Sequence, residues 1–170
     1  KGKGPNTSSD DPRWMFRNSQ FTAGYKFKPE ILNKDAKVYG AYIVNHAAKA
    51  RTITNDKKED AAWYLGASVG EVEKAGDWSV NVDYQFVEAQ AVKDSDVSGI
   101  GRGNFSGTNL YAASTAATAR GNANYKGWEA EFITAVTDNV SLGFEYQSSN
   151  PTDENIGRSE EHTSELQSPC

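Results

Sequence analysis

The sequence predicts an all-β protein, an antiparallel up-and-down meander of about six strands. Three observations lead to this prediction. Short segments alternate between apolar and polar residues, which is the period of a strand with one buried face. No helical pattern accompanies them that could cover a sheet. The connections between the alternating segments are short and long in turn, as in a series of hairpins.

The clearest strand is 78–89, which begins W-S-V-N-V-D-Y-Q-F, and its pattern returns at 140–148 as V-S-L-G-F-E-Y-Q-S. Successive strand side chains point to opposite faces, so each segment has one apolar face and one polar face. A third segment, 127–136, alternates in the same way. The polar face predicted for these three strands carries Asn81, Asp83, Gln85, Glu129, Glu131, Glu145 and Gln147.

Three further strands precede these. The segment 21–27 sets Phe and Tyr against Thr, Gly and Lys, and 61–72 sets Trp63, Leu65 and Val69 against smaller or polar residues. The segment 36–45 is strand-like through its Val, Tyr and Ile residues, although its faces are less cleanly sorted.

The connections differ in length. The short ones are expected to be tight turns, and Gly76 supplies a residue that tolerates positive φ. The polar stretch 46–60 and the Gly-, Ser-, Ala- and Asn-rich stretch 90–126 read as long loops, as does 1–18. The short connections are 28–35, 73–77 and 137–139.

Apolar faces with nothing to cover them, joined by short turns on one side and long loops on the other, are typical of a transmembrane β-barrel. The aromatic residues support this interpretation, because Trp and Tyr favour the membrane–water interface. Six strands are fewer than the roughly 8 of the smallest membrane barrels, so we expect a partial barrel, an open sheet. The residues expected to face lipid or form an aromatic girdle are Trp63, Trp78, Val82, Phe86, Trp128, Phe132 and Tyr146.

Pattern alone leaves one alternative open, a soluble cell-surface β-sandwich that binds carbohydrate. In a sandwich the apolar faces of two sheets would pack on each other, and aromatic side chains would gather at one binding face. Dependence on detergent would separate the two, because isolated barrel strands aggregate in water.

Composition excludes other classes of protein. The 170 residues carry a net charge of −5, which argues against a nucleic-acid partner. No stretch approaches the roughly 20 apolar residues of a membrane helix. One Cys allows no internal disulfide, and the chain starts at Lys1 with no apolar signal segment, as expected of a mature N-terminus or a fragment.

The order and spacing of several motifs carry a family resemblance. They are K-A-G-D-W-S-V-N-V-D-Y-Q-F-V-E-A-Q-A-V at 74–92, D-S-D-V-S-G at 94–99, G-T-N at 107–109 and V-T-D-N-V-S-L-G-F-E-Y at 136–146. In this order they resemble the bacterial putative porin family of outer-membrane β-barrels. The resemblance covers roughly the C-terminal two-thirds of 1–157, and the terminal strand of that family is missing.

The resemblance implies a bacterial outer-membrane location and passive diffusion of small hydrophilic solutes through a water-filled pore. It implies contact with outer-membrane lipid, no enzymatic activity and no cofactor, and it leaves homo-oligomerisation of the full-length protein open. The acidic polar face would then line the pore and favour cations over anions.

No motif points to catalysis or to a metal. Asp94 and Asp96 lack the ligand spacing of a calcium loop, and His46 has no Cys or His partner. The glycines of G-x-G-x-x-x-G at 101–107 precede no amphipathic helix, so a nucleotide loop is not indicated.

The last residues differ from the rest. The segment 158–168, R-S-E-E-H-T-S-E-L-Q-S, resembles the translation of a common short-read sequencing adapter, and it has no strand period. We therefore divide the chain into a partial porin barrel, 1–157, and a non-native tail, 158–170, for which we expect no function.

Overall fold

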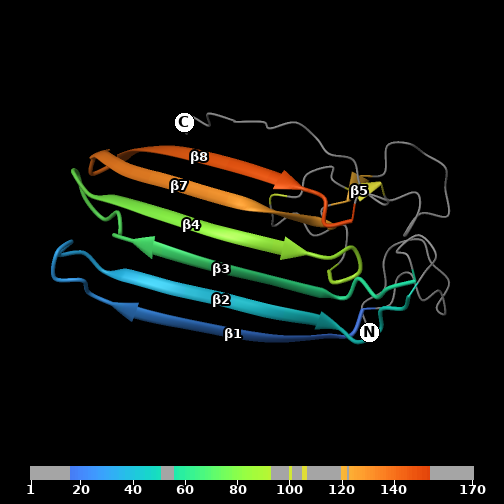
Figure 1. The fold of residues 1–170 in the computed structure, drawn as a ribbon. Coiled ribbons are helices and arrows are strands. Elements are labelled where there is room, and N and C mark those ends of the chain that lie inside the picture. Colours follow the sequence, from blue (N-terminus) through green and yellow to red (C-terminus); the bar gives the residue numbers. More distant parts are fainter. Residues whose placement is uncertain are drawn as a thin grey trace.

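The computed structural model describes residues 16–50, 56–92, 100, 105–106, 120–121 and 123–153. The predicted tail lies outside these residues. Six long strands run side by side in one sheet (Figure 1). They are β1 (Asn18–Phe27), β2 (Ala36–Asn45), β3 (Ala61–Val69), β4 (Trp78–Val87), β7 (Tyr125–Thr137) and β8 (Val140–Asn150).

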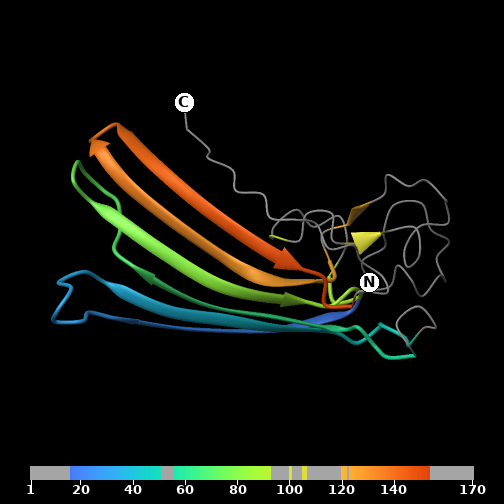
Figure 2. The ribbon, with the colours of Figure 1, turned by 45° about the horizontal axis from the view of Figure 1, so that its top comes forward.

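The strand order is β1-β2-β3-β4-β7-β8, and every neighbouring pair is antiparallel. This confirms the predicted all-β, up-and-down meander. The sheet is open and curved, with β1 and β8 at its two edges (Figure 2). The described residues contain no helix that is long and apolar enough to span a bilayer.

The structure moves several predicted boundaries. The first strand begins at Asn18 rather than at residue 21, because Asn18 pairs with Asn45 on β2. The strand predicted for 61–72 ends at Val69, where Gly70 turns the chain with a φ of 82°. The stretch 90–126 was expected to lack regular structure, but it contains the start of β7 and a separate two-stranded sheet, β5 (Phe105–Ser106) and β6 (Arg120–Gly121).

Short and long connections lie at opposite ends of the sheet, as Figure 1 shows. We call the end with the connections 28–35, 70–77 and 138–139 the turn end. The opposite end, where 46–60 and 88–124 connect strands, is the loop end.

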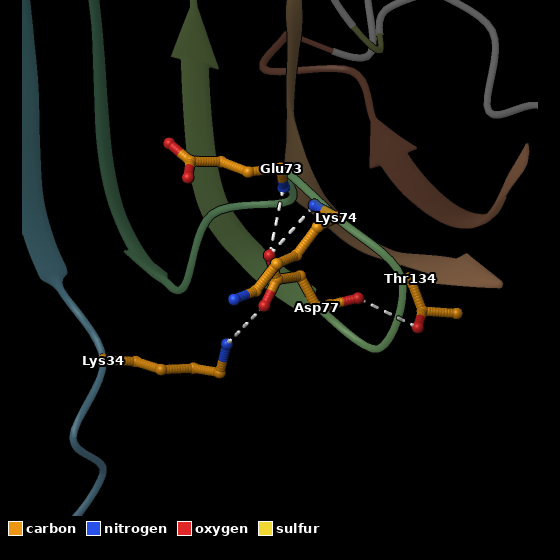
Figure 3. Close-up of polar contacts among 5 residues, drawn as sticks. All are labelled: Lys34, Glu73, Lys74, Asp77 and Thr134. Atoms are coloured by element: carbon orange, nitrogen blue, oxygen red, sulfur yellow. Dashed lines mark hydrogen bonds and ion pairs between the residues drawn. The ribbon is translucent and has the colours of Figure 1, made fainter. Parts of the chain in front are cut away.

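The turn before β4 is held by the side chain of Asp77 (Figure 3). The Asp77 carboxylate accepts hydrogen bonds from the backbone N–H groups of Glu73, at 3.3 Å, and Lys74, at 3.1 Å. The Lys34 ammonium lies 4.0 Å from the carboxylate, and the hydroxyl of Thr134 donates to the Asp77 carbonyl at 3.1 Å. The two backbone donors, followed by Lys34, hold the pKa of Asp77 below its usual value of 3.8.

Glycine makes room for an aromatic bridge across β3. The hydroxyl of Tyr39, on β2, donates a 2.6 Å hydrogen bond to Oδ1 of Asn81, on β4, so the ring must cross the intervening strand. It crosses at Gly66, where a Cβ would lie 2.6 Å from Oη of Tyr39 and collide with the ring. The ring also contacts Tyr64 edge-on and the Lys37 ammonium, so a shift that admits a Cβ would disturb these contacts and the hydrogen bond to Asn81.

Replacing Gly66 with alanine should therefore reduce the free energy of unfolding by about 1–3 kcal/mol, the usual cost of overpacking. Gly143→Ala is the matched control, because a Cβ at Gly143 meets nothing within 4 Å. Urea unfolding of the refolded protein in detergent micelles measures both. Equal effects of the two substitutions would contradict the bridge.

Removing the carboxylate of Asp77 by Asp77→Ala should lower the urea midpoint at neutral pH, because two turn N–H groups lose their acceptor. The folded-state pKa is depressed, so the stabilisation is present above pH 3.8 and disappears as pH falls through the folded value. The wild-type and variant midpoints should thus converge in acid. Glu73→Ala, which keeps the backbone donor, serves as the control, and a midpoint difference that does not vary with pH would argue against the assignment.

Candidate functional site

The seven polar residues predicted to share a face do so. They form a connected array on β4, β7 and β8. In the pairing register Asn81 lies opposite Glu131 and Asp83 opposite Glu129, while Glu129 and Glu131 lie opposite Gln147 and Glu145 on the other side. We call this side of the sheet the polar face and the opposite side the apolar face.

Amide side chains separate the carboxylates of the polar face. The Nε2 of Gln85 donates to Asp83 at 2.9 Å and to Glu129 at 3.2 Å, so one amide serves acids on two strands. Asn81 donates to the other oxygen of Asp83 at 3.4 Å, and Gln147 donates to Glu145. Each amide supplies donors to neighbouring acidic groups that would otherwise only repel one another.

Two tyrosines complete this array, and the sequence did not single out either. Tyr39 reaches Asn81 across Gly66, and the hydroxyl of Tyr125 donates to Oε1 of Gln85 at 2.9 Å. The segment containing Tyr39 had poorly sorted faces, and Tyr125 lay in a predicted loop. Only the pairing register places them beside the acidic residues.

The part of the polar face formed by β1 and β2 carries basic residues. Lys26 on β1 and Lys37 on β2 are cross-strand partners near the turn end. Lys37 is two residues before Tyr39 on β2, so both side chains are on the polar face. The Lys26 ammonium forms ion pairs with Asp35, at 2.9 Å, and Glu71, at 2.8 Å. Among the described residues, no Lys or Arg forms such an ion pair with the acidic groups on β4, β7 and β8. The negative potential is therefore concentrated on one half of the face.

Large apolar side chains populate the opposite face and are exposed. The residues named below are 37% to 71% exposed, whereas Asp83 is only 7% exposed and Glu129, Glu131 and Glu145 are half-buried. These apolar residues include Phe21, Tyr25, Phe27, Val38, Tyr42, Trp63, Leu65, Val82, Trp128, Phe132, Leu142, Phe144 and Tyr146.

Aromatic rings of the apolar face form a chain near the loop end. Trp63 stacks on Phe86 with ring centroids 5.8 Å apart and lies 5.6 Å from Tyr84, which meets Trp128 edge-on at 4.9 Å. Trp78 begins β4 at the turn end, where the Lys34 ammonium lies 4.9 Å from its ring centre. Aromatic groups thus lie near both ends of the strands.

Val82 and Phe132 lie in the middle of β4 and β7, between these two ends. Val82 pairs with Ala130, and Phe132 lies opposite Phe144 with ring centroids 6.3 Å apart. Tyr146 pairs with Ala130, so it lies farther from the loop end than Trp128 does. All seven residues predicted for the apolar face are on it.

The described residues contain no group of three or more His, Cys, Asp or Glu side chains that could hold a metal ion. Of the motifs considered for ligand binding, Asp94, Asp96 and most of 101–107 lie outside the described part of the chain, while His46 hydrogen-bonds to Ser19 at 2.9 Å. The arrangement offers a charged, hydrogen-bonding surface.

Comparison with known proteins adds no relative. No family model matches the chain, and neither the curated proteins nor the solved structures include a significant match.

Proposed function

We propose that the chain is part of an outer-membrane porin, in which the apolar face meets lipid and the polar face lines a water-filled path for small hydrophilic solutes. The observation that carries this proposal is the inverted exposure of the two faces. Apolar side chains up to 71% exposed stand on one side, and acidic side chains in a less accessible array stand on the other.

The energetics of solvent favour this assignment. Exposed apolar surface costs about 25 cal/mol per Å² relative to its burial, and soluble monomers seldom expose large contiguous apolar patches. Contact of the apolar face with lipid hydrocarbon removes that cost. A water-filled path on the polar face lets the carboxylates stay hydrated. Strands of 9 to 13 residues also suit the roughly 9–11 residues that a tilted strand needs to cross a bilayer.

The ends of the strands support the same assignment. The aromatic chain from Phe86 to Trp128 at the loop end and Trp78 at the turn end place ring systems where the two membrane interfaces would lie. Separation of short turns from long connections matches the usual placement of periplasmic turns and outer loops. No described second sheet covers the apolar face, as a carbohydrate-binding sandwich would require.

Charge on the polar face leads to a prediction about selectivity. Within a Debye length of about 8 Å at physiological salt, Asp83, Glu129, Glu131 and Glu145 should raise the local concentration of cations. Replacing the four with Asn or Gln should reduce the cation selectivity of the full-length protein, measured as reversal potential in planar bilayers. The effect should shrink in high salt.

The control for that experiment neutralises Glu30 and Glu73, which lie in turn-end connections. It should leave the reversal potential nearly unchanged. Identical low-salt reversal potentials for the wild type and the quadruple variant would contradict the assignment of these carboxylates to the conducting path.

Arginine on the apolar face provides the complementary test. Val82→Arg and Phe132→Arg should each reduce the free energy of unfolding from lipid vesicles by about 2–4 kcal/mol, the cost of Arg near the bilayer midplane. Thr22→Arg is the control, because Thr22 pairs with Ala41 on the polar side of the sheet. If Val82→Arg inserts with unchanged stability, lipid contact at this position is ruled out.

A further inference from the structure

The chain that leaves β4 does not run directly into solvent. Residues 88–91, which we call the strap, turn back across the loop ends of three other strands. Glu88 N–H donates to the carbonyl of Ala61, and Gln90 N–H donates to the carbonyl of Glu59, two residues earlier in the chain. The strap's hydrogen bonds are Glu88 N to Ala61 O at 3.0 Å, Gln90 N to Glu59 O at 2.7 Å, Asn45 Nδ2 to Gln90 O at 2.7 Å and Asn18 Nδ2 to Ala91 O at 3.0 Å.

The strap is buried against the polar face. Ala89 and Ala91 are fully inaccessible and Gln90 is 3% exposed. Ala91 belongs to an apolar cluster at the loop end, whose members on the sheet share the face of the acidic residues. The cluster consists of Ala62, Val87, Ala91, Ile100, Ala123 and Tyr125. The strap therefore covers one end of the polar face.

Amide side chains hold the strap in its docked position through hydrogen bonds. Asn45, 1% exposed, accepts hydrogen bonds from Arg17 N–H and Ala47 N–H through Oδ1 while its Nδ2 holds Gln90. Asn124 is fully inaccessible. Its Nδ2 donates to the carbonyl of Asp153, and its Oδ1 accepts a hydrogen bond from Asp153 N–H. Glu59, Glu88 and Asp153, from three parts of the chain, lie close enough at the loop end to interact electrostatically.

Glu59 is the most enclosed of these acids, with 9% of its surface exposed. Burial, then the nearby carboxylates of Glu88 and Asp153, raise the pKa of Glu59 from 4.5 to about 7, and Lys57 opposes the shift. Asp60 adds a smaller repulsion. The Glu88 carboxylate accepts Ala61 N–H at 2.7 Å, and burial raises its pKa as well.

We propose that the strap is a proton-controlled cover of the loop end, held down when Glu59 is neutral and loosened when Glu59 is ionised. Ionisation places a charge in an enclosed site beside the carboxylates of Glu88, Asp153 and Asp60, with Lys57 as the opposing cation. Release of the strap returns the Glu59 carboxylate to water and relieves the repulsion. The access to one end of the polar face thereby becomes a function of pH.

The direction of the pH effect follows from the raised pKa. A proton binds Glu59 more tightly under the docked strap than after release, so docking is most favourable below the ordinary pKa of 4.5. It weakens as pH rises from 4.5 to about 7 and then levels off.

Amide hydrogen exchange of the full chain in detergent micelles tests the proposal, with mass spectrometry of peptides that contain residues 88–91. After correction for intrinsic exchange, protection of the wild-type strap should fall about tenfold between about pH 5 and about pH 8. Glu59→Gln, which keeps a neutral side chain of the same shape, should retain protection at both values. Glu73→Gln, in the turn-end connection, should behave as the wild type.

Glu88→Gln gives a second measurement that does not depend on Glu59→Gln folding. Removing the charge that repels ionised Glu59 most strongly should move the midpoint of the wild-type transition to lower pH. A strap whose protection does not change with pH, or a transition that persists unchanged in Glu59→Gln, would overturn the proposal. Because exchange reads the strap directly, its result is independent of whether the protein conducts.

Discussion

The whole structure depends on one constraint, the two-residue period of a strand applied to a sheet whose apolar side is exposed. Every long strand contributes to both faces, so a shift of one residue would move its apolar side chains to the polar face and its polar side chains to the apolar face. The register that places Asp83 opposite Glu129 also places Val82 opposite Ala130 and Tyr84 opposite Trp128. The acidic array and the aromatic chain are consequences of the same pairing.

The polar face satisfies its groups from within the sheet. Gln85 connects Asp83, Glu129 and Tyr125, and Tyr39 spans a strand to reach Asn81. A partly enclosed polar network is stable only when its donors and acceptors are paired. The small size of Gly66 is therefore as important as the hydrogen-bonding side chains, because it allows β2 and β4 to be linked across β3.

Much of the fold could be predicted from the sequence, because a local pattern determines it. Alternation identified all six long strands, and it assigned Asn81, Asp83, Gln85 and their partners on β7 and β8 to one face. Turn chemistry identified Gly76, which has a φ of 87°. The pore and lipid roles of these residues remain predictions.

Features that depend on contacts distant in sequence escaped prediction. Glu59 follows two lysines and precedes an aspartate, so its neighbours indicate a solvated loop, yet the strap encloses it. Tyr125 begins β7 because it pairs with Val87, and the low-complexity stretch before it gives no sign of this. Register and strand order supply this information, and neither can be read from one segment alone.

The account is tested most directly by spin labels placed one at a time at 128–133 on β7 of the protein in lipid vesicles, with Cys170 replaced. Collision with oxygen, which concentrates in lipid, and with a water-soluble nickel chelate is then measured at each position. The account predicts that oxygen collisions dominate at 128, 130 and 132 and nickel collisions at 129, 131 and 133. The opposite phase, or no alternation, would contradict the assignment of the apolar face to lipid.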